Sequence, residues 1–218
     1  MNQNAEKVVK GLLLRYPQLK TCEKSICAAI EFMIDAFQNG NRLLICGNGG
    51  SASDSLHIVG ELMKGFVLQR KLPNDLQSAL RKATPNSAEY LIENLQGALP
   101  AISLVSEAAL STAYANDKAP DLAFAQQVLG QGRKGDVLLA ISTSGNSANV
   151  LYAAQVAKAL EISVVGLTGV GGGKLKTWAD VLIDVPEKET YKIQELHLPV
   201  YHAICLALEQ EFFGEEQE

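Results

Sequence analysis

Short apolar runs alternate along the chain with longer segments in which apolar residues recur every three or four positions. The short runs are residues 42–46, 101–105, 136–142, 163–169 and 180–185. Most of them are nearly continuous in apolar residues, which is typical of strands buried on both faces. Because helix-length segments separate the runs, the pattern predicts an α/β fold with a parallel sheet wrapped by helices.

The segment of residues 66–99 interrupts this alternation. Pro73 and Pro85 punctuate it, and each is followed by a short helical pattern that begins with residues of the capping type. We interpret the segment as a helical insertion that follows the helix containing His57. Two roles are equally compatible with it, namely packing between subunits and a lid over a site.

The composition indicates one compact domain. With 218 residues, of which 47% are hydrophobic, the chain can form one substantial core, so we expect a single domain over residues 1–218. No apolar run is as long as a membrane span, and residues 1–20 lack the features of a secretory signal, so we expect a cytoplasmic protein that does not bind membranes. The net charge of −5, without any basic tract, argues against a nucleic-acid partner.

Two loops of unusual composition follow predicted strands. In an open parallel sheet, ligands bind beyond the carboxyl ends of the strands, in loops of this kind. The first loop is Gly47-Asn48-Gly49-Gly50-Ser51, directly after the strand of residues 42–46. Its glycines permit positive φ and a close approach of a ligand to the backbone, and Ser51 is placed to cap the helix that follows.

The second loop, residues 142–147, supplies four hydroxyl groups and a glycine before an amphipathic helical pattern over residues 147–160. The free N–H groups and the positive dipole end of a helix attract an anion, so this loop favours a phosphate group. Neither GxxxxGK(S/T) nor GxGxxG is present, which makes a nucleotide the weaker alternative. The structural alternative is that the hydroxyls merely cap the helix, for which one would suffice.

The three histidines of the chain all lie in two predicted helices. His57 and Glu61 are four positions apart, so they share a helical face and can converge on one ion or one substrate, although such a pair is usually a surface hydrogen bond. The buried stripe of that helix is expected to comprise Ala52, Leu56, Val59 and Met63.

The segment of residues 191–212 has helical apolar spacing and carries the other two histidines, His197 and His202. Pro199 removes an N–H group within this helix, so we expect a kink between them. The location of all three histidines on two helices suggests a shared site, in which we take His197 as a structural residue.

Four separated motifs resemble, in the same order, those of the phosphoheptose isomerases, a family of the sugar-isomerase (SIS) domain superfamily. The motifs are CGNGGSASDSLH…GEL at 46–62, ND at 116–117, GDVLLAISTSGNSANV at 135–150 and IQELHLPVYH at 193–202. The resemblance implies a flavodoxin-like three-layer sandwich with a five-stranded parallel sheet. It also implies a homotetramer with active sites at subunit interfaces and a bound zinc ion, with another divalent metal as the alternative.

The resemblance further assigns roles residue by residue. It implies that the enzyme converts sedoheptulose 7-phosphate to D-glycero-D-manno-heptose 7-phosphate through an enediol, with Glu61 and His202 as the acid/base pair. The implied zinc ligands are His57, Glu61, Gln194 and His202. The implied substrate contacts are Asn48, Gly49, Gly50, Ser51, Glu61, Asn116, Asp117, Ser142, Thr143, Ser144, Ser147 and Gln194.

These residue types suit an aldose–ketose isomerisation. A carboxylate can act as base and an imidazole as acid, while a zinc ion can polarise the carbonyl group. Gln194 and His202 are eight positions apart, which corresponds to about 12 Å of rise in a regular helix. Either that helix is irregular, or side chains of different subunits complete the site.

Two other functions stay open. The first is a non-catalytic SIS protein of the type that associates with a bacterial replication initiator, but such a scaffold has no need for the full set of implied zinc ligands. The second is an isomerase or deaminase that acts on another sugar phosphate. Residues 62–66 and 190–191 differ from those usual in the family, which keeps this alternative open.

Overall fold

The computed structural model describes residues 1–214, so the last four residues of the expected domain lie outside the described residues. Five parallel strands form one sheet in the order β2-β1-β3-β4-β5. The strands are β1 (Leu43–Cys46), β2 (Ala101–Ser103), β3 (Val137–Ile141), β4 (Ser163–Gly169) and β5 (Val181–Val185). All five predicted strands are confirmed, and this strand order is that of the flavodoxin-like fold.

Helices flank the sheet within the described part of the chain. They are α1 (Gln3–Arg15), α2 (Glu23–Gln38), α3 (Gly50–Met63), α4 (Asn74–Ala83), α5 (Ala88–Asn94), α6 (Ala108–Asp117), α7 (Ala123–Gln131), α8 (Ala148–Ala159) and α9 (Thr190–Phe213). Short 3-10 segments are η1 (Pro17–Cys22), η2 (Pro120–Leu122) and η3 (Gly173–Thr177). None of these helices is long and apolar enough to cross a lipid bilayer.

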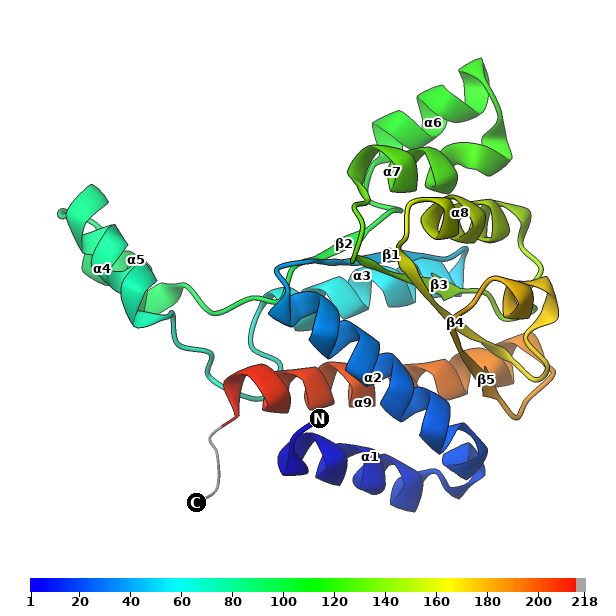
Figure 1. Cartoon of the computed structure of the whole chain (residues 1–218), viewed down its shortest axis with the longest axis horizontal. Helices are drawn as coiled ribbons and strands as arrows, with labels where there is room; N and C mark the ends of the chain where they lie inside the picture. The colour runs from blue at the N-terminus through cyan, green and yellow to red at the C-terminus, as the bar shows by residue number, and fades with distance from the viewer. Residues whose placement is uncertain (215–218) are drawn as a thin grey trace.

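The sheet separates two hydrophobic cores, because side chains alternate between the two faces of each strand. Leu43 and Ile45 of β1 join the core under α1, α2 and α9, whereas Leu44 and Cys46 join the core under α7 and α8. Figure 1 shows the same layers, with α2 and α9 on one side of the sheet and α8 on the other. The three-layer sandwich is therefore confirmed.

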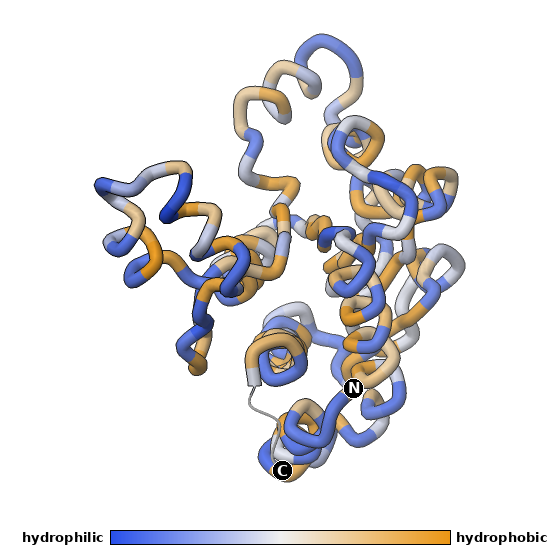
Figure 2. The backbone as a smooth tube through the Cα atoms, turned by 60° about the vertical axis from the view of Figure 1, so that its left-hand side comes forward, coloured by the Kyte–Doolittle hydropathy of each residue, from blue (hydrophilic) through white to orange (hydrophobic). Residues whose placement is uncertain are grey.

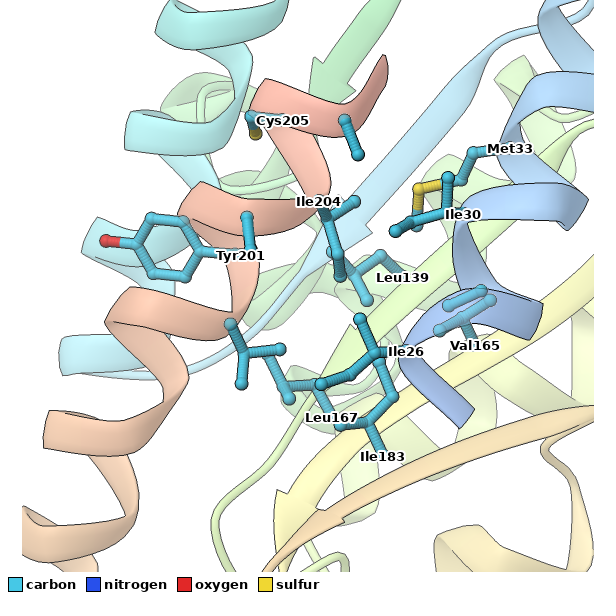
Figure 3. Packing of buried hydrophobic residues seen from close by; sticks show 14 of the residues in the cluster. Ile26, Ile30, Met33, Leu139, Val165, Leu167, Ile183, Tyr201, Ile204 and Cys205 are labelled. Atoms are coloured by element: carbon cyan, nitrogen blue, oxygen red, sulfur yellow. The ribbon is translucent and has the colours of Figure 1, made fainter. Parts of the chain in front are cut away.

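The larger core brings α2, the strands and α9 into contact. Figure 3 shows Ile30 of α2, Val165 of β4 and Ile204 of α9 converging there, and all three are buried. Tyr201 lies at the edge of the same cluster, with its hydroxyl group pointing away from the aliphatic side chains (Figure 3). Packing against this core fixes the face that α9 turns toward α3.

The helical insertion of residues 66–99 is confirmed, and it contains α4 and α5. The two helices project from the body of the molecule (Figure 1), and α4 has no buried residue. Figure 2 shows hydrophobic as well as hydrophilic stretches in this projection, and Tyr90 is 70% exposed. The predicted capping side chains make no cap hydrogen bond in either helix. In the single chain the insertion does not cover the loops after β1 and β3, and its role stays a prediction.

The expected buried stripe of α3 was wrong. The buried residues of α3 are Ser51, Ser55, Ile58 and Leu62, whereas Leu56 and Met63 are 49% and 47% exposed. The small side chain of Ser55 lets α3 lie close to β2, where its hydroxyl bonds that of Ser103 at 2.7 Å. In α9 the helix is continuous through Pro199, and the expected kink stays a prediction.

Candidate active site

The glycine loop joins the carboxyl end of β1 to α3. Gly49 has a φ of 57°, which favours glycine, and it occupies the N-cap position of α3. A Cβ atom on Gly50 would collide with the side-chain amide of Gln194 from α9. Ser51 is buried and makes no capping bond, so the expected cap is wrong. The loop and Gln194 therefore meet, as expected for two groups of substrate contacts.

A reciprocal amide pair connects the glycine loop to α8. Asn48 Nδ2 donates to Asn149 Oδ1 at 2.8 Å, and Asn149 Nδ2 donates to Asn48 Oδ1 at 2.9 Å. Asn149 was not among the predicted site residues. Its position in the first turn of the helix after the serine-rich loop could have indicated a role in the site. Its partner Asn48, however, lies 101 positions away in the sequence. The pair fixes the two loops relative to each other.

The serine-rich loop leaves β3 and enters α8. Ser142 is buried, and its Oγ donates to Ser147 Oγ at 3.1 Å. Ser147 is the N-cap residue of α8, yet its side chain makes no capping hydrogen bond. The first N–H groups of α8 are therefore not occupied by this hydroxyl, which favours the anion-binding interpretation over simple capping.

The remaining hydroxyls lie at the tip of this loop. Ser144 Oγ accepts the backbone N–H of Asn146 at 3.2 Å, and Thr143 is half-buried. Gly145 has a φ of 64°, and a Cβ atom there would collide with the backbone of Gly172 in the loop after β4. The glycine allows the two loops to stack and holds the hydroxyls beside the N-terminus of α8.

A shallow depression of about 440 Å³ lies between the glycine loop, η2 and the start of α8. Its lining residues are Asn48, Pro120, Asp121, Ser147, Ala148 and Asn149. Asn116 and Asp117 lie at the end of α6, just before this lining; both are exposed, and Asn116 Nδ2 donates to Asp117 Oδ1 at 2.9 Å. Their contact with a sugar stays a prediction.

His57, Glu61 and His202 form a second cluster, between α3 and α9. His57 Nε2 lies 3.2 Å from Glu61 Oε1, and the His57 and His202 rings are 5.0 Å apart at nearly a right angle. His202 Nε2 is buried and has no hydrogen-bond partner among residues 1–214. The expected meeting of histidines from the two helices is thus confirmed for His57 and His202.

Tyr201 and Asp54 extend this cluster, and neither was among the predicted site residues. His57 Nδ1 lies 3.0 Å from the Tyr201 hydroxyl, which donates to Asp54 Oδ1 at 3.3 Å. Burial raises the pKa of Tyr201, so the phenol keeps its proton at neutral pH. Because this proton goes to Asp54, the hydroxyl accepts from His57 Nδ1–H. The motif at residues 193–202 did not indicate this hydrogen bond, because Tyr201 also fits a core position of α9.

The two histidines of α9 differ in their surroundings. Burial lowers the pKa of His202, and the nearby His57 lowers it further, so His202 is a neutral imidazole at pH 7. His197 is completely buried, and burial lowers its pKa to about 4 against the opposing effect of the Thr168 backbone. His197 is therefore a core residue, which confirms its structural interpretation.

The four implied zinc ligands are not gathered in the single chain. Gln194 lies against Gly50, whereas His57 follows seven positions later in α3, about 10 Å further along the helix axis. Because α9 is unbroken, helix irregularity does not bring Gln194 to His202. Across the described residues, no group of three or more His, Cys, Asp or Glu side chains is arranged as a metal site. The ligand set stays a prediction.

Comparison with known proteins places the chain in a family. A family model described as SIS domain matches residues 15–103 and 86–169. The phosphoheptose isomerase of Synechocystis sp. is 37% identical over 201 residues, with 90% of each chain covered, and that of Aneurinibacillus thermoaerophilus is 35% identical over 211 residues, with 97% of this chain and 91% of the relative covered.

Solved structures agree with these sequence relatives. The phosphoheptose isomerase of Francisella tularensis superposes with a TM-score of 0.74 at 30% identity, covering 90% of this chain and 91% of that one. The Neisseria gonorrhoeae phosphoheptose isomerase superposes with a TM-score of 0.69 at 32% identity, covering 94% and 91%. With its flavodoxin-like sheet and its two clusters of polar residues, the chain therefore belongs to the phosphoheptose isomerase family of SIS-domain proteins.

Proposed function

We propose that this protein is an aldose–ketose isomerase that converts sedoheptulose 7-phosphate to D-glycero-D-manno-heptose 7-phosphate. Membership of the phosphoheptose isomerase family supports the reaction class and the substrate. The single observation that carries the proposal is the cluster in which His57 Nε2 lies 3.2 Å from Glu61 and the His57 ring lies 5.0 Å from that of His202. The cluster thus contains a carboxylate and, in His202, a neutral imidazole, which are the groups that a proton transfer between adjacent carbons requires.

Glu61 acts as the base in this mechanism. It removes a proton from C1 of the ketose, the C1–C2 bond becomes the double bond of an enediol, and Glu61 returns the proton to C2. His202 moves the hydroxyl proton between the two oxygens, giving it to the C2 oxygen and taking one from the C1 oxygen. A neutral imidazole can donate and accept in the same cycle, which suits the lowered pKa of His202. No outside oxidant or reductant is needed.

The serine-rich loop binds the phosphate group of the substrate. Ser142, Thr143, Ser144 and Ser147 supply hydroxyl donors beside the N-terminus of α8. The N-cap residue Ser147 makes no capping bond there, and of the first-turn N–H groups that of Val150 donates to Asn149 Oδ1 at 3.0 Å. A helix N-terminus and its free N–H groups stabilise an anion. Contacts to the sugar come from Asn48, Gly49, Gly50, Ser51, Asn116, Asp117 and Gln194.

A divalent metal, with zinc as the best candidate, fits the donor chemistry of the second cluster. Because Tyr201 accepts from His57 Nδ1–H, the lone pair of His57 Nε2 faces the Glu61 carboxylate, an arrangement that needs a shared proton or a cation between them. Metal-binding histidines usually donate their other N–H to such an oxygen. His57, Glu61 and His202 would hold the ion, with Gln194 as the fourth implied ligand. When bound, zinc would polarise the substrate carbonyl.

Assembly into a homotetramer with active sites between subunits completes the proposal. Leu56 and Met63, beside the second cluster, are 49% and 47% exposed, and exposed apolar side chains near a site favour coverage by another subunit. Ser51 and Glu61 are ten positions apart in α3, about 15 Å, so one chain alone separates its two clusters. Phosphorylated sugars do not cross lipid bilayers, which supports the expected cytoplasmic location.

NMR of sedoheptulose 7-phosphate incubated with the purified protein tests the proposal. We expect the aldose to form, to stop forming after chelation, and to form again when zinc is added. If the ketose stays unchanged with every divalent metal, the heptose assignment falls. A panel of other sugar phosphates would then test the alternative isomerase, and sedimentation with candidate partner proteins would test the scaffold.

A further inference from the structure

A buried ion pair connects the insertion to α9. Arg70 Nε donates to Glu209 Oε1 at 2.8 Å, and the side chains of both residues are 0% exposed. Burying two charges has a large desolvation cost, which is offset only when further hydrogen bonds satisfy both groups. The remaining partners of the two side chains therefore show what the pair holds in place.

The guanidinium group of Arg70 caps the end of α3. Nη1 donates to the carbonyl oxygen of Leu62 at 2.6 Å, and Nη2 donates to that of Glu61 at 2.9 Å. Carbonyls in the last turn of a helix have no partner within the helix, and a positive charge there is favourable. The helix ends at Met63 in extended backbone, without a glycine cap. Arg70 thus holds the turn from which the Glu61 side chain projects.

The carboxylate of Glu209 holds the other side of the cluster. It accepts the backbone N–H groups of Phe66, Val67 and Leu68 at 2.7, 2.9 and 3.2 Å. The ring of Phe66 lies 5.5 Å from that of His202. Glu209 follows His202 by seven positions in the unbroken α9, which is two helical turns. The same ion pair therefore fixes the segment after Glu61 to the helix that carries His202.

We propose that Arg70 and Glu209 are positioning residues of the isomerase, because together they set the distance between the Glu61 carboxylate and the His202 imidazole. The proposal rests on the roles proposed above for Glu61 and His202. It gives the base of the insertion a function in catalysis that is independent of any role for α4 and α5. A small displacement of a base from a reacting carbon can cost up to about a hundredfold in rate.

The first test is Arg70→Lys, which keeps the charge but cannot bind two carbonyls and a carboxylate in one plane. We expect kcat to fall at least about tenfold, at a temperature where the variant is folded, with little change in KM. Glu209→Gln removes the charge that pairs with Arg70 and should have the same effect, and it replaces Arg70→Lys if that variant does not fold.

The control is Asp136→Asn. Asp136 is also buried and accepts the backbone N–H groups of Arg42 and Arg133 at 3.0 and 2.9 Å, but at the amino end of β3.

The control should lose stability with kcat unchanged. A second readout, NMR of ¹³C-labelled histidine, does not depend on turnover: the His57 and His202 signals should move in the Arg70 and Glu209 variants and stay in place in Asp136→Asn. Loss of stability in the Arg70 and Glu209 variants with normal kcat and unmoved signals would overturn the proposal. If the wild-type protein does not isomerise the sugar, the proposed function falls, and the histidine signals alone decide whether the pair positions the cluster.

Discussion

The two polar clusters of this protein are built in different ways. The serine-rich loop takes its hydroxyls from six consecutive positions, and the end of one strand and the start of one helix place them. The His57, Glu61 and His202 cluster combines two helices that are far apart in sequence, and Tyr201 and the Arg70–Glu209 pair hold it. A contiguous loop positions its own atoms, whereas a dispersed cluster depends on packing. Substitutions should therefore affect binding in the first and chemistry in the second.

Among substitutions in either cluster, Glu61→Gln in the second cluster should have the largest effect on kcat. We expect kcat to fall about a thousandfold because the amide cannot act as a base, while binding of the sugar phosphate, measured by calorimetry, is retained. Glu161→Gln is the matched control, since Glu161 is an exposed carboxylate paired with Lys134 at 2.8 Å. Retained turnover in Glu61→Gln would remove this residue from the chemistry.

Ser144→Ala combined with Ser147→Ala should weaken the first cluster. Two hydrogen bonds to a charged phosphate are lost, so we expect KM to rise at least about a hundredfold with kcat changed much less. Steady-state kinetics measure both, and Ser78→Ala in the exposed α4 is the control. An unchanged KM would place the phosphate elsewhere.

Tyr201→Phe keeps the ring in the core and removes the hydroxyl that accepts from His57. Loss of such an orienting partner usually costs at least about tenfold in metal affinity or activity. Calorimetric titration with zinc and kcat should both report it, whereas Tyr90→Phe on the exposed α5 should change neither. Equal zinc affinity in Tyr201→Phe and the wild type would show that the hydroxyl does not orient His57.

His197 should affect stability and not catalysis. Its pKa is about 4 in the folded protein and about 6.5 in the unfolded chain, so the unfolded state binds the proton first and stability falls as the pH drops below 6.5. We expect a loss of about 2 kcal/mol between pH 7 and pH 5 from this group. Urea unfolding at both pH values measures it, and His197→Gln should lose less. An equal loss in that variant would assign the pH dependence to other groups.

Much of the fold was predictable because its signals are local. Continuous apolar runs identify strands that are buried on both faces, and Leu43 and Leu44 illustrate why, since they face opposite cores. The rotation of α3 was not predictable in the same way. Leu56 and Met63 are apolar but exposed, and Ser55 is polar but buried against β2. Exposed apolar side chains imitate a core stripe in the sequence.

The site was predictable only in part, for the same reason. The motifs bring His57 and His202 to adjacent helices, and the structure confirms their contact. The reciprocal pair of Asn48 and Asn149 and the hydrogen bond of Tyr201 to His57 were missed, because each joins positions more than 100 residues apart. No periodicity in the chain carries information on such contacts.

By itself the sequence determined the parallel sheet, the glycine loop, the serine-rich loop and the residue types of an isomerase, because backbone conformation and helix ends follow from neighbouring residues. The tertiary structure alone decided which groups meet. Arg70 and Glu209 are 139 positions apart, and their charges can be buried only where the end of α3, the base of the insertion and α9 converge to satisfy every donor and acceptor.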